Sequence, residues 1–383
     1  MSSTRNVALG QPTVGEEEIE ALREVFASGW LSGAGPTCVA FEKEFAVTAG
    51  TAHALATSNC GSALHLALQV LGAGPGDEVI VADYTFPATG HAVVWTGATP
   101  IFADVRPDIG TIDVDAAAAL VTERTVGIIA VDLVGQPADY DELAALARKH
   151  GLWLLEDAAC SAGATYKGRP AGSLADLAAF SFHGRKGITS GEGGALVGDD
   201  TDLMDRARKL HTYGIAPAVS REGQSALAVP EFDTAGYNYR MSDVQAAIMR
   251  VQLRRLPDLL ANRTRAAEGY AERLAGVEGI SLPVLLDDRT HPWQSYLVTA
   301  QDGVDRDRVV MALRERGVGS NIGTYSSHVQ PVYGATRDCP VAARLFRTQF
   351  ALPMHANLTD DDLDHVAEQL REVLAAAEVR TSA

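Results

Sequence analysis

One lysine of this sequence sits in a setting that suits covalent chemistry. Lys186 follows the apolar run 178–182 and precedes the glycine-rich turn 191–194. A lysine amine can condense with an aldehyde as a Schiff base, whereas an ordinary solvated lysine has no need of the surrounding glycines and hydroxyls. We therefore predict that Lys186 is a catalytic residue.

A carboxylate ends the preceding apolar run. Asp157 closely follows residues 152–155, and ligands of an open parallel sheet bind at the carboxyl ends of its strands. Pyridoxal 5′-phosphate needs such a pair, because a carboxylate keeps its pyridine nitrogen protonated while a lysine holds its aldehyde. Asp157 and Lys186 are predicted for these two roles, although Asp at a strand end is also a favoured helix N-cap.

Two further segments could complete a site for this cofactor. Cys60, Gly61 and Ser62 open a helical pattern, and the backbone N–H groups of a helix start can bind a phosphate. Phe86, in the loop that follows the strand pattern 78–82, could stack on a flat ring, although a single Phe more often belongs to a core. The sequence therefore predicts a phosphate site and a stacking residue near Lys186.

The elements around these residues alternate between strand and helix patterns. Apolar runs typical of buried strands lie at 78–82, 100–103, 126–131, 152–155, 178–182 and 195–197. Helical spacing with a terminal glycine, as in 140–151, separates them. This alternation predicts an α/β fold with a mostly parallel sheet covered by helices.

A second, smaller domain is expected after the sheet. A long helical stretch, 242–275, is predicted to be interrupted at Pro257 and to lead away from the sheet. Beyond it we expect a strand over 295–300 and helices over 306–316 and 359–377. The predicted division is a large domain over 1–250, with an N-terminal helical arm, and a small α+β domain over 251–383.

Composition excludes several classes of partner. The 383 residues carry a formal net charge of −17, from 32 Lys plus Arg against 49 Asp plus Glu, which disfavours nucleic acid and anionic membranes. The four cysteines are far apart and form no disulfide or zinc pattern. Without a signal peptide or a long apolar run, a cytoplasmic location is expected. Glu16, Glu17 and Glu18 are predicted to be the solvated first turn of a helix, and no metal site is expected.

Taken together, the motifs resemble the DegT/DnrJ/EryC1/StrS family of sugar aminotransferases almost from end to end. The resemblance is carried by segments in the same order as in the family, namely 15–18, 28–36, 63–68, 74–81, 156–159, 166–173, the Lys186 segment and 236–242. It implies a pyridoxal-phosphate enzyme of fold type I and a homodimer whose sites are built from both subunits. It also implies ping-pong transfer of an amino group from L-glutamate to a keto sugar carried on a nucleotide.

The resemblance also assigns roles by position. Lys186 matches the Schiff-base lysine, Asp157 the partner of the pyridine nitrogen and Phe86 the stacking aromatic. Ser181, and Cys60 with Gly61, match phosphate-binding positions, and Asn238 matches the asparagine that reaches the phosphate from the neighbouring subunit. The substrate-side candidates are His183, Tyr325 and His328, the last two in a segment similar to the family's histidine-containing substrate loop.

Two positions depart from the family pattern. Gly61 replaces a threonine and so removes one hydroxyl, which leaves the backbone amide and Ser62 to compensate. Cys160 stands where relatives place Gln or His near the cofactor's phenolic oxygen, and a thiol is a weak donor.

The sequence leaves more than one substrate class as an alternative. The 191–194 turn resembles members that act at carbon four of the sugar more than those that act at carbon three. A nucleotide-linked 4-keto-6-deoxy sugar is favoured over a cyclitol such as a keto-inositol, although the catalytic lysine does not distinguish the two. A non-catalytic regulatory relative is a third possibility, against which the presence of both Lys186 and Asp157 argues.

Overall fold

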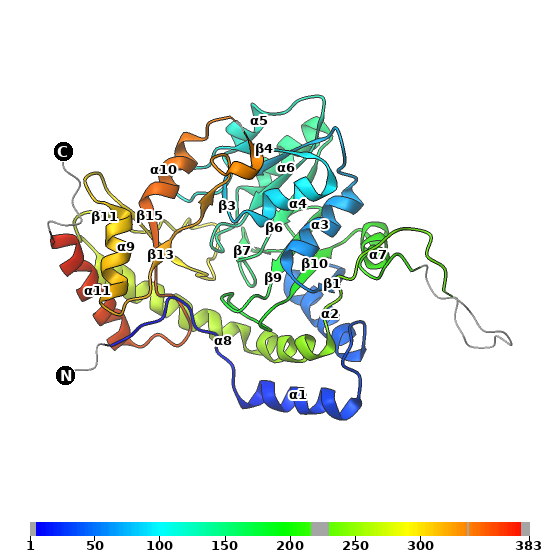
Figure 1. Cartoon of the computed structure of the whole chain (residues 1–383), viewed down its shortest axis with the longest axis horizontal. Helices are drawn as coiled ribbons and strands as arrows, with labels where there is room; N and C mark the ends of the chain where they lie inside the picture. The colour runs from blue at the N-terminus through cyan, green and yellow to red at the C-terminus, as the bar shows by residue number, and fades with distance from the viewer. Residues whose placement is uncertain (1–4, 216–229, 335–336, 377–383) are drawn as a thin grey trace.

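A seven-stranded sheet forms the centre of the molecule (Figure 1). The structure, a computed structural model, describes residues 5–215, 230–334 and 337–376. The sheet order is β1-β10-β9-β6-β5-β2-β4, and only β10 runs against the others. The strands are β1 (His53–Thr57), β2 (Glu78–Ala82), β4 (Thr99–Ala103), β5 (Thr125–Val131), β6 (Trp153–Asp157), β9 (Leu177–Ser181) and β10 (Gly194–Gly198). The expected mostly parallel sheet is confirmed.

Helices cover both faces of this sheet, as the side-chain alternation of its strands requires. In β1, Leu55 packs into the same cluster as Leu64 of α3, whereas Ala54 packs on the opposite face with Phe41 of α2. The covering helices are α2 (Pro36–Ala49), α3 (Cys60–Leu71), α4 (Ala88–Thr96), α5 (Val114–Ala118), α6 (Tyr140–His150), α7 (Thr201–Leu210) and α8 (Asp243–Leu274). The α/β fold predicted from the sequence is thus confirmed.

The predicted break at Pro257 is wrong, because α8 runs through it as one helix. Pro257 is exposed, while Leu256 and Leu259 beside it are buried in the cluster against α2. Proline removes one helical hydrogen bond, but packing of the neighbouring side chains holds the helix together.

A second hydrophobic cluster gathers around the far half of α8. It contains Ala266 and Tyr270 of α8 together with side chains of α9 (Arg306–Glu315), α11 (Asp360–Ala375) and a four-stranded sheet of order β11-β12-β15-β13. These strands are β11 (Ile280–Ser281), β12 (Tyr296–Ala300), β15 (Gln349–Leu352) and β13 (Asn321–Ile322). The expected strand and both expected helices are present. Val7 also packs here and pairs with Val318, and the domain boundary at residues 250 and 251 stays a prediction.

The N-terminal helix α1 (Glu16–Ser28) packs against α8 along the lower edge of Figure 1. Glu16 and Glu17 are exposed as predicted, but Glu18 is buried. Its carboxylate caps the helix by accepting the Gly15 N–H at 2.7 Å and binds Gln252 of α8 at 2.6 Å. The prediction of a fully solvated acidic turn was therefore wrong at Glu18.

Short elements complete the chain. They are β3 (Tyr84–Thr85), β14 (Tyr325–Ser326), β7 (Thr165–Tyr166), β8 (Arg169–Pro170), the 3-10 helix η1 (Pro331–Tyr333) and α10 (Pro340–Thr348). Within the described ranges, no helix combines the length and the hydrophobicity needed to cross a bilayer.

Candidate functional site

The sheet brings the predicted lysine and carboxylate to the same edge. β6 and β9 are parallel neighbours in which Asp157, the last residue of β6, pairs with Ala179. The chain leaves β9 at this edge and turns back at residues 183–186, where the Lys186 N–H donates to the His183 carbonyl at 2.8 Å. Lys186 Nζ then donates to Cys160 Sγ at 3.1 Å, in the segment that directly follows β6.

Charge and burial set the ionisation of these groups. Burial raises the pKa of Asp157, and the hydroxyl of Thr89 and the charge of Lys186 offset only part of that shift. Burial lowers the pKa of Lys186, but Cys160, Cys60 and Asp157 raise it by more, so the net direction is upward. Burial and the charge of Asp157 raise the pKa of the Cys60 thiol. The cluster therefore places one ammonium among two thiols and a buried carboxylate.

Thr89 supports Asp157 and was not assigned a role from the sequence. Its hydroxyl donates to Asp157 Oδ2 at 2.7 Å, and the Ala159 N–H donates to Oδ1 at 3.2 Å. Thr85 of β3 lies behind it, with the two threonine hydroxyls 3.1 Å apart. Both threonines come shortly after β2, Thr85 in β3 and Thr89 in the first turn of α4, so their place near a strand end was the available signal.

The start of α3 lies against the first residue of β10, at the sheet edge where the chain returns from the Lys186 turn. Thr57 of β1 and Ser181 of β9 pair with Gly194 from opposite sides, so the three residues form one row across the sheet edge. A Cβ at Gly194 would lie 2.5 Å from the backbone carbon of Asn59, just before α3. Glycine at position 194 is thus what lets the helix start approach this closely. Ser181 is half-buried next to it.

The helix start is capped by Asn59, whose Oδ1 accepts the Ser62 N–H at 2.8 Å. The first N–H groups of a helix have no intrahelical partner, so those of Cys60 and Gly61 suit an anion. A Cβ at Gly61 would lie 3.2 Å from the Asn59 Oδ1, and thus a larger residue would crowd this cap. Ser62 Oγ lies 3.2 Å from the Ser58 hydroxyl, which offers a further polar group.

Of the aromatic and histidine candidates, Phe86 and His183 are exposed, whereas His328 points into the protein. Phe86 is 62% exposed and meets Tyr325 edge to face, with ring centroids 6.0 Å apart. His328 is instead turned inward, with Nδ1 3.0 Å from Asp83 Oδ2. His183 is exposed and accepts the Arg185 N–H at Nδ1, 3.3 Å away.

Asn238 lies on the surface between two stacked tyrosines. Tyr237 and Tyr239 are parallel to within 7°, with centroids 4.8 Å apart, and both pack against His65 of α3. The Tyr239 hydroxyl also lies 3.1 Å from His65 Nδ1. The rings fix the backbone here, while Asn238 itself is exposed.

A pair of buried acids lies next to Asp157. Asp132 follows β5, its Oδ1 accepts the Tyr140 hydroxyl at 2.8 Å, and its N–H donates to the Asp157 carbonyl at 3.1 Å. Glu156 accepts the Gly172 N–H at 2.9 Å. Burial raises the pKa of Asp132 to about 6, and burial together with the Asp132 charge raises that of Glu156. The pair therefore keeps a proton at a pH where exposed carboxyls have lost theirs.

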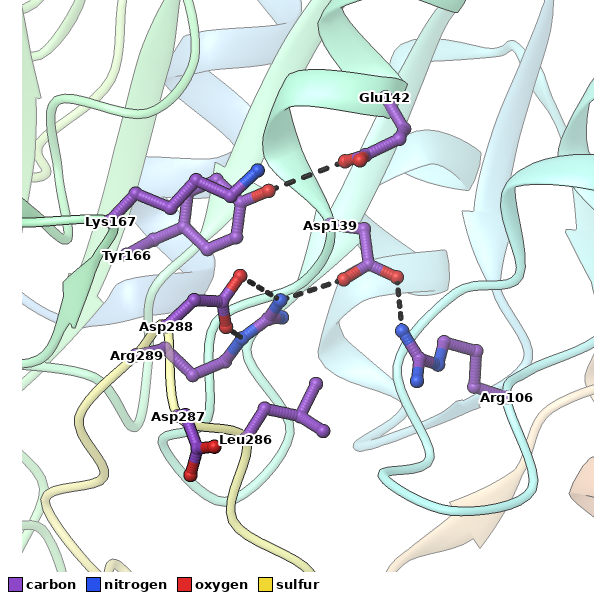
Figure 2. A pocket seen from close by; sticks show the side chains of 9 residues that line it. All are labelled: Arg106, Asp139, Glu142, Tyr166, Lys167, Leu286, Asp287, Asp288 and Arg289. Atoms are coloured by element: carbon purple, nitrogen blue, oxygen red, sulfur yellow. Dashed lines mark hydrogen bonds and ion pairs between the residues drawn. The ribbon is translucent and has the colours of Figure 1, made fainter.

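An open cavity of about 450 Å³ lies apart from these residues (Figure 2). Its two arginines already have partners, since Arg289 pairs with Asp139 and Asp288, and Arg106 with Asp139. None of the predicted site residues lines it. The lining residues are Arg106, Asp139, Glu142, Tyr166, Lys167, Leu286, Asp287, Asp288 and Arg289.

Comparison with known proteins matches this geometry to one family. The model of the DegT/DnrJ/EryC1/StrS aminotransferase family matches residues 12–371. The spore coat polysaccharide biosynthesis protein SpsC of Bacillus subtilis is 38% identical, over 96% of this chain and 97% of its own length. GDP-perosamine synthase of Caulobacter vibrioides is also 38% identical, over 98% of this chain and 100% of its own. The solved structure of DesI, in the presence of its TDP-sugar product, superposes with a TM-score of 0.88 at 34% identity and covers 97% of this chain and 93% of its own.

Replacing Asp132 by Asn is expected to stabilise the protein at neutral and alkaline pH. In the folded wild type Asp132 holds its proton up to about pH 6, whereas the unfolded chain releases it near its ordinary pKa, so wild-type stability falls as pH rises through this window. Asn keeps an acceptor for Tyr140 and does not titrate. Urea unfolding should show a gain on the order of 1–3 kcal/mol at about pH 8 that shrinks toward about pH 4. Asp132→Ala, which loses the acceptor, should be less stable at every pH, and parallel pH profiles for wild type and Asp132→Asn would contradict the assignment.

Gly194→Ala is expected to destabilise the fold, because its methyl group would collide with the Asn59 backbone. We expect a loss of about 1–3 kcal/mol in urea unfolding. Gly187→Ala, in the turn that precedes β10, is the matched control, since a Cβ there meets nothing within 4 Å. Equal losses in the two variants would show that the close approach at Gly194 is not the constraint.

Proposed function

Because the chain belongs to the DegT/DnrJ/EryC1/StrS aminotransferase family and is a sugar aminotransferase, we propose that it moves an amino group from L-glutamate to the keto group of a nucleotide-linked 4-keto-6-deoxy sugar. The observation that carries the proposal is the convergence of Lys186, Cys160 and Asp157 at the ends of two adjacent parallel strands. The names of two relatives, GDP-perosamine synthase and DesI with its TDP-sugar product, support a nucleotide sugar.

The residues at this edge fit pyridoxal 5′-phosphate. Asp157 is a buried carboxylate with two neutral donors, so a protonated ring nitrogen would supply the cationic partner that its burial calls for. Phe86 exposes its ring beside the site, and the start of α3 offers backbone N–H groups for a phosphate. When bound, the cofactor supplies an electron sink and carries the amino group between the two substrates.

Each side chain then has a defined task. Asp157 holds a proton on the ring nitrogen, and Thr89 holds Asp157 in place. Lys186 would hold the cofactor aldehyde and, with its amine free, would move a proton at the donor's α-carbon. Cys160, which contacts Lys186 Nζ, would be the residue beside the cofactor's phenolic oxygen. The same steps in reverse aminate the keto sugar, which gives ping-pong kinetics.

We also propose a homodimer in which Asn238 completes the phosphate site of the partner. The stacked Tyr237 and Tyr239 hold Asn238 outward, where it can reach a second copy. Large apolar side chains are exposed on and between α1 and α2, which suits an interface. They are Ile19, Phe26, Trp30, Leu31, Val39 and Val47.

Lys186→Ala is expected to abolish covalent cofactor binding. The wild-type protein mixed with pyridoxal 5′-phosphate should develop the visible absorption of a lysine imine, and borohydride should fix the cofactor to the peptide that contains Lys186. The variant should show neither signal. Cys160→Ser, which keeps a polar group beside the amine, is the matched control and should retain both. A colourless wild type would overturn the proposal.

The acceptor is identified by offering nucleotide keto sugars and keto-inositols, each with L-glutamate, and weighing the aminated product. A nucleotide-linked 4-keto-6-deoxy sugar should react at least tenfold faster, as kcat/KM, than any keto-inositol, which is about 1.4 kcal/mol of transition-state binding. Preference for a keto-inositol would replace the sugar assignment with the cyclitol alternative. L-Glutamate alone should convert the bound cofactor to its amine form in a single turnover.

A further inference from the structure

Asp83 fastens the 325–330 segment to the end of β2. This residue is fully buried, and its Oδ1 accepts the His328 N–H at 2.6 Å. Its Oδ2 accepts the Ser326 hydroxyl at 2.5 Å and lies 3.0 Å from His328 Nδ1, and its carbonyl accepts the Ser327 N–H at 2.9 Å. Three successive residues of one segment therefore bind a single residue of the loop after β2.

The two fastened segments carry the exposed rings of the site. β14 pairs with β3 over two residues only, with Tyr325 opposite Thr85, and Phe86 directly follows β3. The Phe86 and Tyr325 rings meet at 70° and are 62% and 36% exposed. We call these two rings the aromatic wall. A ladder of two residue pairs has little stability of its own. The hydrogen bonds to Asp83 are therefore needed to hold β14 against β3.

The same loop also reaches the carboxylate of the site. Thr85 lies 3.1 Å from Thr89 across their hydroxyls, and Thr89 donates to Asp157 Oδ2 at 2.7 Å. A shift of β3 would therefore move the aromatic wall and the support of Asp157 together.

His328 is placed to act on this loop more than on a substrate. Its side chain is 8% exposed, and its Nδ1 faces Asp83 and the Ser326 hydroxyl. A carboxylate oxygen accepts hydrogen bonds, so we assign Nδ1–H of the imidazole as the donor to Asp83. Without that donor, a buried carboxylate loses one of its partners, which is costly.

We propose that Asp83 and His328 are positioning residues that hold the aromatic wall over the cofactor ring, and that His328 acts through Asp83 without touching the sugar. The inference rests on the proposed function, because the wall has this role only if Phe86 covers the bound cofactor. It also assigns a different task to His328 from the substrate contact that the family resemblance implies.

The test is a double-mutant cycle in the full-length protein. His328→Phe keeps a ring and removes the donor, whereas His328→Asn can donate from its amide in place of Nδ1. Each is made in the wild type and in Phe86→Ala, and the dissociation constant for pyridoxal 5′-phosphate is measured by visible titration. Visible circular dichroism of the bound cofactor reports the ring's orientation, and far-ultraviolet spectra verify folding.

His328→Phe should weaken cofactor binding about tenfold and reduce the dichroic band, and His328→Asn should restore both to within about twofold. In the Phe86→Ala background His328→Phe should add less than about twofold, because the wall it positions is already gone. Three results would overturn the inference. The first is a double variant whose dissociation constant rises by the product of the two single effects, and the second is no change in the dissociation constant with His328→Phe. The third is an equal rise with His328→Asn and His328→Phe. A wild type that never binds the cofactor would instead overturn the proposed function, so the two failures are distinguishable. Should His328→Phe not fold, Asp83→Asn, which retains one acceptor oxygen, is expected to give the same partial loss and the same coupling to Phe86.

Discussion

Everything at this site depends on keeping the Asp157 carboxylate buried at the carboxyl end of β6. A carboxylate removed from water needs donors or a positive charge, and here it has one hydroxyl, one backbone N–H and the nearby ammonium of Lys186. Parallel pairing of β6 with β9 provides the geometry, because both chains leave the sheet at the same edge and on adjacent strands. The position of Lys186 relative to Asp157 therefore depends on the pairing of β6 with β9.

Buried polar groups and a close backbone contact surround this edge of the sheet. Asp132 and Glu156 hold a proton between them in the core, and Asp132 is bonded through its backbone to the Asp157 carbonyl. Gly194, the first residue of β10, allows the start of α3 to lie directly against the sheet at the point where the chain returns from the Lys186 turn. The first N–H groups of α3 therefore lie at the same sheet edge as Asp157 and Lys186, where backbone donors suit an anion.

The loop after β2 joins the two hydrophobic clusters at the site. β3 pairs with β14, a segment from the C-terminal part of the chain, and the Tyr84 hydroxyl reaches Gln349 of β15 at 3.0 Å. The aromatic wall is thus built from both parts of the molecule. A relative displacement of the two parts would therefore move the two rings of the wall against each other.

The sequence alone predicted the α/β class and every strand of the central sheet except β1, because buried parallel strands are continuous apolar runs. It also placed the candidate chemistry at strand ends, which meet at one edge of a parallel sheet. Lys186, Asp157 and the start of α3 were chosen as candidates in this way. Two features depend on tertiary packing, which a local sequence pattern does not contain. Helix α8 continues through Pro257 because Leu256 and Leu259 are buried beside it. Glu18 is buried because its carboxylate accepts a hydrogen bond from Gln252 of α8. The contact between Asp83 and His328 also depends on the fold, because the two residues are far apart in the chain. Neither residue type indicates from the sequence that the other is its hydrogen-bond partner.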